Sequence, residues 1–216
     1  MEILIIAVTR TYAGFCVVGI NSSKNFIRPI RGRGGNRFWP ERQLTHQDGF
    51  IKCGEVWELK GGQVESEFQN HKEDFLASEF NYKHSLDHNK FIRFLNKSTE
   101  DQQAFLDTVH GRSRSICLVT VNRLNIIRRY WEGQLRLRMG FTGSFSLGNP
   151  KTIDNLYPVK DCKWERLLQQ NYQPPDFERI FVCFGLAIPT PYDRIEYPQI
   201  IGLHTLPDVE HPINYP

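Results

Sequence analysis

The stretch EILIIAVTRTYAGFCVVGI, residues 2–20, decides how the fold begins. It holds two runs of β-branched, aromatic and other apolar side chains, one on each side of Gly14. Runs of this kind, separated by a turn residue, are typical of two adjacent strands. We therefore expect the chain to start with a strand, a turn and a second strand.

Short strands are also predicted after this pair. NFIRPI, residues 25–30, predicts a third strand that ends at Pro29, and EVWEL, residues 55–59, predicts another strand bounded by glycines. Between them, the Gly- and Arg-rich segment RGRGGNRFWPERQ, residues 31–43, predicts a loop. Short strands at close spacing favour a small barrel or sandwich in this part of the chain.

The middle of the chain changes to a helical pattern. SLDHNKFIRFLN, residues 85–96, and STEDQQAFLDTVHG, residues 98–111, predict two helices. Ser98 or Thr99 is the expected N-cap of the second helix, and Gly111 follows its end. These helices separate two regions rich in strands.

Strands return after residue 111. SICLVTVNRLNIIRRYW, residues 115–131, and QLRLRMGFT, residues 134–142, predict one long antiparallel pair. CKWERLLQQN, residues 162–171, predicts a short helix, and the segments 179–188 and 197–206 predict two more strands.

The order of these elements predicts a mostly β fold with minor α content. Strands and long helices do not alternate, which argues against a parallel α/β fold. We expect two small β-barrels, with the first at 1–80, a helical connection at 81–111, and the second at 112–216, which includes the short helix and a C-terminal tail.

Composition indicates a globular protein of the cytoplasm. The chain has 216 residues with 40% apolar and 24% charged side chains, and its net charge is only +3. Its five cysteines are widely spaced and odd in number, which suits reduced thiols better than a disulfide framework. The apolar run at the start is too short for a signal peptide, and no stretch has the length of a membrane span. We therefore expect a cytoplasmic location and no membrane partner.

The modest net charge hides a strong segregation of basic residues. Residues 24–43 hold six basic residues and one acid, and residues 112–138 hold seven arginines and one acid. Each expected barrel thus contributes one basic segment, which indicates a polyanionic partner such as nucleic acid.

A hairpin places the arginines of the second segment on one surface. With Glu132-Gly133 as a two-residue turn, Trp131 lies opposite Gln134 and Arg129 opposite Arg136. The period of two then places one set on a shared polar face: Arg123, Arg129, Trp131, Arg136 and Arg138. Like charges opposite one another destabilise a sheet unless an anion neutralises them, and Arg suits phosphates and bases. An aromatic ring among arginines is typical of single-strand binding, although an arginine on a solvated strand face is also common in proteins without a ligand.

The first basic segment is expected to complete this surface. Glycine allows close approach of a phosphate to the backbone, and an aromatic residue next to the loop offers a stacking platform for a base. The residues concerned are Arg28, Arg31, Arg33, Arg37 and Trp39.

One pattern favours a different activity. Asp48, followed by Glu58 and Lys60 on one face of a strand, resembles the Asp…Glu-x-Lys set of metal-dependent nucleases. The surrounding sequence lacks the helix and parallel sheet of that nuclease core. The chain has no other motif that names an enzyme, and we expect no catalytic residues, no metal site and no cofactor.

Several motifs resemble the dual OB-fold domain family described in prokaryotic conflict systems. The opening ILIIAVTRTYAGFCVVGI and the strand FIRPI, residues 26–30, are similar to the start of that domain. Later blocks that resemble it are HKEDFLA (71–77), PVKDCKWERLL (158–168) and CFGLAIPTPYDRIEYPQIIGLHTL (183–206). The resemblance implies two OB-like barrels, a nucleic-acid-recognition role beside a separate effector protein, and Arg28 as a motif residue. It supplies no catalytic residues.

The leading hypothesis is therefore a non-enzymatic module that binds single-stranded or structured nucleic acid, DNA or RNA. The first alternative is an adaptor whose basic face docks an acidic protein. The second alternative is the metal-dependent nuclease.

Overall fold

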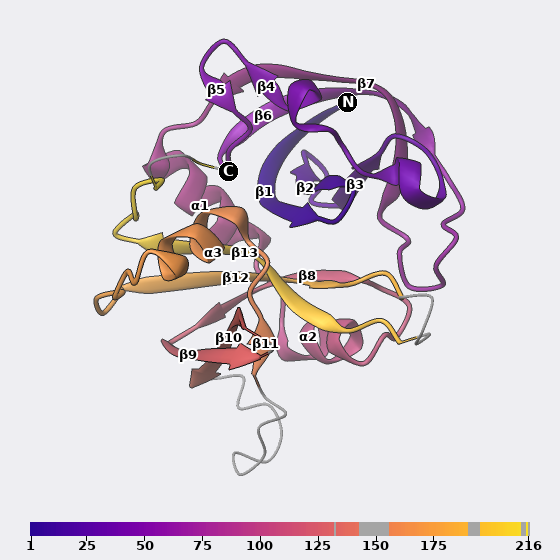
Figure 1. Cartoon of the computed structure of the whole chain (residues 1–216). Helices are drawn as coiled ribbons and strands as arrows, with labels where there is room; N and C mark the ends of the chain where they lie inside the picture. The colour runs from indigo at the N-terminus through magenta and orange to yellow at the C-terminus, as the bar shows by residue number, and fades with distance from the viewer. Residues whose placement is uncertain (132, 143–155, 190–194, 213–214, 216) are drawn as a thin grey trace.

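A computed structural model of the chain describes residues 1–131, 133–142, 156–189, 195–212 and 215. Figure 1 shows an upper, indigo-to-purple half that contains the N-terminus, and a lower half built from later strands. The first half comprises β1 (Glu2–Thr11), β2 (Gly14–Asn21), β3 (Phe26–Ile30), two 3-10 turns (Gly34–Arg37 and Glu41–Gln43), β4 (Thr45–His46), β5 (Gly49–Phe50), β6 (Glu55–Gln63) and β7 (Asp74–Ser85). The remainder comprises α1 (His88–Ser98), α2 (Gln102–Val109), β8 (Ile116–Val121), β9 (Arg123–Trp131), β10 (Gln134–Thr142), β11 (Tyr157–Pro158), α3 (Cys162–Gln169), β12 (Arg179–Leu186) and β13 (Pro198–Leu206).

The first half is a closed five-stranded barrel. Its strand order is β1-β2-β3-β7-β6, with β6 returning to pair with β1. β3 and β7 are parallel, and the other neighbours are antiparallel. The expected strands β1, β2, β3 and β6 are all present. The twelve-residue strand β7 was missed, because its polar residues interrupt the apolar pattern on which the prediction depended.

The opening stretch is apolar throughout because β1 is buried on both faces. Ile3, Ile5 and Val8 point into the barrel core, whereas Leu4 and Ile6 pack against strands of the second half. β2 divides its side chains in the same way. Complete burial of such a side chain contributes about 1.5–3 kcal/mol, so the stretch stabilises the barrel and its junction with the second half together.

The second half consists of two three-stranded sheets, ordered β13-β12-β8 and β11-β10-β9. Both sheets contribute to one apolar core, for example through Val182 and Val119 from the first sheet and Met139 from the second. α2 and α3 add Phe105 and Trp164 to this core. The long strand expected over residues 115–131 is in fact two strands, β8 and β9, which belong to different sheets and part at Asn122.

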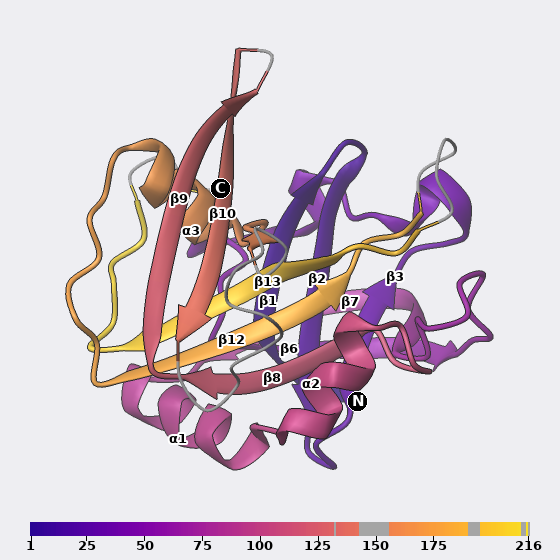
Figure 2. The ribbon, with the colours of Figure 1, turned by 90° about the horizontal axis from the view of Figure 1, so that it is seen from below.

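A third apolar cluster joins the halves. The outward faces of β1 and β2 meet Ile116, Phe181 and Cys183 of the β13-β12-β8 sheet, and α1 covers the cluster with Phe91 and Leu95. Figure 2 views the molecule from below and shows β12 and β13 crossing in front of β1 and β2. The halves therefore share a buried interface.

Each α-helix in the described ranges begins at an aspartate whose side chain accepts a backbone N–H. The caps are Asp87 for α1, Asp101 for α2 and Asp161 for α3. The expectation of Ser98 or Thr99 as the cap of α2 was wrong, because Ser98 ends α1 and Thr99 follows it. The mostly β fold with minor helix is confirmed. No helix within the described ranges is long and apolar enough to cross a membrane.

Candidate nucleic-acid interface

The hairpin β9–β10 has the predicted register. Trp131 pairs with Gln134, Arg129 with Arg136, and Ile127 with Arg138. Gly133 has a φ of +73°, a value that glycine adopts without strain in a two-residue turn. The arginines at 129 and 136 are therefore direct cross-strand neighbours.

The two faces of the hairpin differ as the alternation predicted. Leu137 and Met139 are buried in the core of the second half. On the opposite face, the side chains of Arg123, Arg136 and Arg138 are exposed. The side chains of Arg129 and Trp131 lie outside the described part of the structure, so the predicted aromatic position on this face stays a prediction.

Arg128 breaks the alternation for a structural reason. Its side chain lies on the apolar face, where Nε donates to the Leu168 carbonyl at 3.3 Å and Nη2 to the Tyr172 carbonyl at 2.9 Å. These carbonyls belong to the last turn of α3 and the segment that follows; the Leu168 carbonyl also accepts the backbone N–H of Asn171 at 3.2 Å. Arg128 thus has a structural role, because its hydrogen bonds hold the end of α3 against the hairpin.

The outer part of the hairpin is a two-stranded ribbon. β11 pairs only with Arg138 and Met139, so the residues nearer the turn have no third strand beside them. Figure 2 shows the hairpin extending past the neighbouring elements. Tyr130, near the turn, is 77% exposed. The ribbon is therefore accessible to a large partner.

The exposed arginines of the hairpin have no carboxylate partner among the described residues. Arg138 donates to the Leu156 carbonyl at 3.0 Å, which leaves its charge uncompensated. No ion pair within the described ranges involves Arg123, Arg136 or Arg138. By contrast, Arg114, in the same basic segment, is paired with Glu100 at 2.7 Å. The hairpin thus presents positive charge to solvent.

The arginines of the first basic segment are arranged differently. Arg28 and Arg37 are only 4% and 3% exposed, and both bind Asp74. Arg28 Nη1 lies 3.1 Å from Asp74 Oδ1, and Arg37 Nη2 lies 3.0 Å from each carboxylate oxygen. Ser66 Oγ also donates to Asp74, at 2.6 Å. Two of the expected surface arginines are therefore buried and matched by a carboxylate.

Arg28 also links the two halves of the molecule. Its Nη1 contacts His71 Nδ1 at 2.5 Å, and its Nη2 donates to Ser115 Oγ, just before β8, at 2.8 Å. Ser115 Oγ in turn donates to Glu73 at 2.8 Å. Burial, together with the nearby guanidinium groups of Arg28 and Arg37, lowers the pKa of His71 well below its usual range. Arg28 is therefore a motif residue with a structural role.

The same network reaches the segment before β13. His71 Nε2 faces Glu196 Oε1 at 3.3 Å. The other oxygen of Glu196 accepts from Asn70 Nδ2, while Asn70 Oδ1 accepts from the Ser113 backbone N–H at 3.0 Å. Two blocks of this network, FIRPI (26–30) and HKEDFLA (71–77), were already recognised in the sequence as family motifs. That they join was not predicted, because Ser113, Ser115 and Glu196 lie far from both blocks in the chain.

Trp39 and the glycine-rich loop do not close over the hairpin. Trp39 is 5% exposed, and its indole N–H donates to the Pro29 carbonyl at 2.7 Å inside the first barrel. Arg31 and Arg33 are exposed, and the Gly34 N–H donates to Glu67 at 2.8 Å. In Figure 2, β1 and β2 lie between β3, which precedes the loop, and the hairpin. The expected single patch is therefore two separate regions, the hairpin and the loop that carries Arg31 and Arg33. The exposed side chains of these two loop arginines also lack a carboxylate partner in the described part of the chain.

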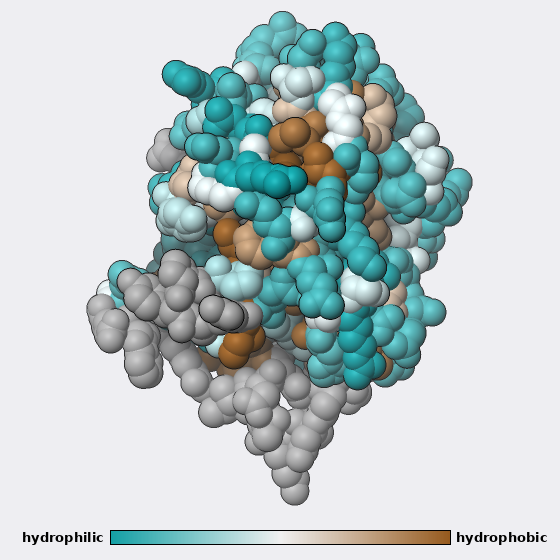
Figure 3. All heavy atoms as spheres, turned by 90° about the vertical axis from the view of Figure 1, so that its right-hand side faces the viewer, coloured by the Kyte–Doolittle hydropathy of each residue, from teal (hydrophilic) through white to brown (hydrophobic). Residues whose placement is uncertain are grey.

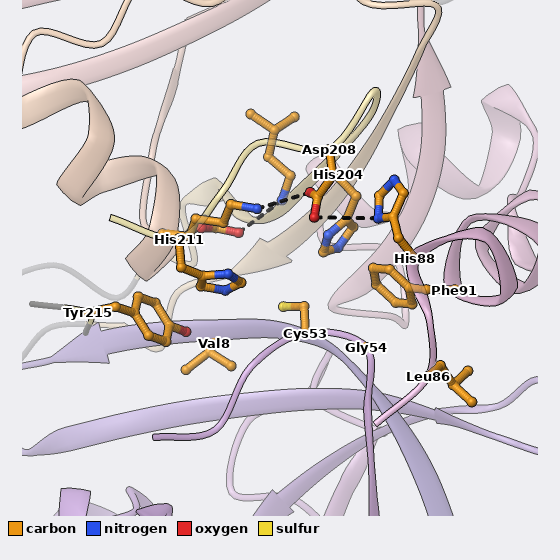
Figure 4. A pocket seen from close by; sticks show the side chains of 13 residues that line it. Val8, Cys53, Gly54, Leu86, His88, Phe91, His204, Asp208, His211 and Tyr215 are labelled. Carbon is orange, nitrogen blue, oxygen red and sulfur yellow. Dashed lines mark hydrogen bonds and ion pairs between the residues drawn. The ribbon is translucent and has the colours of Figure 1, made fainter. Parts of the chain in front are cut away.

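Among the cavities that lie where the halves meet are the following two. The larger, of about 860 Å³, is lined by β1, β2 and β3 on one side and by residues around β12 and β13 on the other; we call it the central cleft. The smaller, of about 150 Å³, lies beside the C-terminal tail and is shown in Figure 4. There, Asp208 pairs with Lys163 at 3.1 Å and with His88 at 3.5 Å, and His204 and His211 lie close by.

The residues of the expected nuclease set have separate ion-pair partners. Lys60 pairs with Glu79 at 2.9 Å, and Glu58 with Lys83 at 3.8 Å. Asp48 lies 4.0 Å from His46, in the turn between β4 and β5. Within the described ranges, no group of three or more His, Cys, Asp or Glu side chains is arranged to hold a metal ion.

Comparison with known proteins identifies the class of fold. The dual OB-containing domain family matches residues 1–202, so the chain belongs to this family. A domain of this kind suggests a nucleic-acid-binding type of module, and the family resemblance predicted from the sequence is confirmed. No curated protein and no solved structure matches the chain.

Proposed function

We propose that this protein binds nucleic acid, single-stranded or structured, through the exposed face of the hairpin β9–β10, without catalysing a reaction. The single observation that carries the proposal is the set of exposed arginines at 123, 136 and 138, which have no carboxylate partner in the described part of the chain. When such a face neutralises phosphates, counterions condensed on the nucleic acid are released, and this release favours binding. Arg guanidinium groups also stack on bases, which suits unpaired strands.

The test is fluorescence anisotropy with labelled DNA and RNA oligonucleotides at rising salt. We expect the logarithm of the affinity to fall linearly with the logarithm of the salt concentration, by roughly 0.7–0.9 per phosphate contact. The triple variant Arg123→Gln/Arg136→Gln/Arg138→Gln should lose most of the affinity. The matched control, Arg42→Gln/Arg93→Gln/Lys97→Gln, removes the same charge from exposed positions elsewhere and should bind nearly as wild type.

Two results would contradict this proposal. One is the absence of binding at low salt, and the other is equal weakening by the hairpin variant and the control. Co-purification of an acidic protein that the hairpin variant releases, together with the absence of oligonucleotide binding, would instead support the adaptor. Oligonucleotide decay that needs Mg²⁺ and stops in Glu58→Ala would support the nuclease.

The resemblance to a family described in prokaryotic conflict systems also supports a proposal about the pathway in which the protein acts. We propose that the module acts beside a separate effector in a prokaryotic defence system, with nucleic acid as the signal it recognises. Removal of the gene from its host should then lower survival during phage infection, and the hairpin variant should not restore it. Unchanged survival would contradict this setting.

A further inference from the structure

The central cleft has the size and position of a small-molecule site. Its volume is about 860 Å³, and its walls come from both halves of the protein. Ligand sites typically occupy roughly 300–1,000 Å³, are mostly apolar and occur at the junction of domains. The hairpin β9–β10 contributes no residue to the lining, so the cleft is a separate candidate site.

The walls of the cleft are largely apolar and partly aromatic. Leu186, Ile188 and Pro189 line it from the end of β12 onward, and Tyr12 and Phe38 line it from the first barrel. The Tyr12 and Phe38 rings are 5.9 Å apart in an edge-on arrangement, and Tyr12 is 85% exposed. β12 ends toward the right of Figure 1, and Figure 3, viewed from that side, shows brown apolar atoms next to teal hydrophilic ones. These walls favour a ligand whose body is apolar.

Arg37 brings to the cleft hydrogen-bond donors that the protein itself does not use. Its side chain lines the cleft and is only 2% exposed. Nη2 makes both of its bonds to Asp74, and the Phe68 ring lies 5.0 Å from the guanidinium carbon. Within the described part of the structure, neither Nε nor Nη1 has a hydrogen-bond partner. A buried donor without a partner is costly, so an oxygen atom of a ligand that accepts from Nη1 would remove this cost.

The charge around Arg37 favours an acceptor that is an anion. Asp74 is shared between Arg37 and Arg28, so two guanidinium groups have one described carboxylate in direct contact. The neighbouring carboxylate of Glu73 accepts from Ser115 instead. A ligand with a single negative charge would compensate the second guanidinium, whereas a dianion such as a phosphate monoester would be repelled more strongly by Asp74. Other charged residues also line the cleft, and the site needs none of them as a ligand contact: Arg10, Lys160 and Glu165.

We propose that the central cleft binds an organic acid, whose carboxylate accepts from Arg37 Nη1 and whose apolar body packs against Ile188 and Tyr12. A carboxylate supplies both the acceptor and the single negative charge, and hydrogen bonds between ionised partners are stronger than neutral ones. The apolar body matches the walls that the end of β12 and the first barrel provide. The site goes beyond the hairpin interface and does not depend on it.

Isothermal titration calorimetry of the full chain with octanoate and 3-phenylpropanoate tests this site. At least one of the two acids should bind saturably. Its amide has the same shape without the charge and should bind about tenfold more weakly, because a neutral hydrogen bond replaces a charge-assisted one. Ile188→Trp should fill the cleft and abolish binding. Circular dichroism and thermal melting of each variant confirm folding.

Arg37→Lys tests the polar contact. Lysine keeps a cation beside Asp74 but has no counterpart of Nη1, so the variant should bind the acid about tenfold or more weakly. Arg33→Lys makes the same change at an exposed position of the same segment and should bind as wild type. Should Arg37→Lys fail to fold, the amide still tests the charge of the ligand and Ile188→Trp still tests its location.

The outcomes separate this site from the hairpin. Acid binding that survives in the hairpin triple variant, and is lost in Ile188→Trp, supports the proposal whether or not the hairpin binds oligonucleotides. Equal affinity for the acid and its amide would overturn it, as would binding that is unchanged in Ile188→Trp or in a folded Arg37→Lys protein. No saturable binding of either acid would overturn it as well.

Discussion

Arg28 Nη1 lies 2.5 Å from His71 Nδ1 inside the protein. Because a guanidinium has only donors, His71 accepts on Nδ1 and carries its proton on Nε2, which faces Glu196 at 3.3 Å. A buried charge in the first barrel is thereby connected to the segment before β13. The hydrogen bonds that join the two halves here run from Arg28 to Ser115 and from Asn70 to Glu196. The several partners of the Arg28 guanidinium explain why an arginine, rather than another cation, occupies position 28.

Replacement of Arg28 should destabilise the whole protein. Arg28→Ala removes one of the two guanidinium groups that bind Asp74 and leaves Ser115 Oγ without its donor in a buried site, and loss of one partner of a buried ion pair costs about 3–5 kcal/mol. Arg28→Lys should also be destabilising, because an ammonium group does not reproduce the planar fork that reaches three partners. Urea unfolding at pH 7 measures both effects.

Arg33→Lys is the matched control for this measurement. Arg33 lies in the loop after the same strand, but its side chain is exposed. Its stability should stay within about 0.5 kcal/mol of wild type. An Arg28→Lys protein as stable as this control would show that the buried network does not stabilise the fold.

Two adjacent glycines of β6 should respond in opposite ways to the same substitution. Gly61 has a φ of +144°, and a Cβ there would overlap the Leu76 carbonyl of β7. Gly61→Ala should therefore cost at least about 2 kcal/mol, the scale of a strained backbone position. Gly62 has open space around it, so Gly62→Ala should be neutral or stabilising by about 0.4–1 kcal/mol through the unfolded chain. Thermal melting of the two variants checks the contrast, and equal melting temperatures would contradict it.

Much of the fold follows from local sequence patterns. The continuous apolar run of β1 and the alternation along β10 each predict a strand directly, and the Glu132-Gly133 turn fixes the hairpin register residue by residue. β7 was not predictable in the same way, since its partners β3 and β6 are distant in sequence and its own residues are mixed. Similarly, the break between β8 and β9 at Asn122 reflects which sheet each strand joins, and that is a tertiary property.

The candidate site was predictable only where charge and strand period coincide. On the hairpin, the period of two separates Arg123, Arg136 and Arg138 from the core, so the sequence alone identifies their face, whereas Arg128 lies on the apolar face. The arginines at 28 and 37 belong to an equally basic segment, yet they are buried because Asp74, more than thirty residues away, neutralises them. Charge counts within a segment do not include such distant partners, and they therefore overestimate how much of the charge is exposed.

His204 should make stability depend on pH in the acidic range. Burial lowers its pKa from 6.5 to about 4, and its Nε2 donates to the Ile6 carbonyl at 2.8 Å. The unfolded chain therefore binds a proton between pH 6.5 and 4 that the folded chain does not. The free energy of unfolding therefore has the full contribution of the neutral His204 above pH 6.5. It loses on the order of 3 kcal/mol of that contribution as the pH falls to 4. His211, whose pKa burial also lowers to about 4, acts in the same direction.

The variant His204→Gln tests this dependence. The amide N–H₂ of glutamine replaces the donor to Ile6 but does not titrate, so the variant should lose less stability than wild type between pH 7 and pH 4.5. Urea unfolding at the two pH values measures the difference. His84→Gln, at an exposed position of β7, is the control and should follow the wild-type curve. An equal loss in wild type and His204→Gln would rule out His204 as a source of the pH dependence.

Substitution of Arg128 should mainly lower the stability of the protein, whereas substitution of Arg136 should mainly weaken oligonucleotide binding. Arg128 donates to two carbonyls at the end of α3, so Arg128→Gln should cost about 1.5–3 kcal/mol, the value of hydrogen bonds from a charged group. Arg136 is exposed opposite Arg129, so Arg136→Gln should leave stability within about 0.5 kcal/mol of wild type or raise it slightly by removing a like-charge pair. For oligonucleotide binding the order reverses: Arg136→Gln should reduce the salt slope by roughly 0.7–0.9, whereas Arg128→Gln should keep it. Parallel urea unfolding and anisotropy titrations measure both properties, and a salt slope that falls equally in both variants would show that the ligand does not distinguish the two faces of the hairpin.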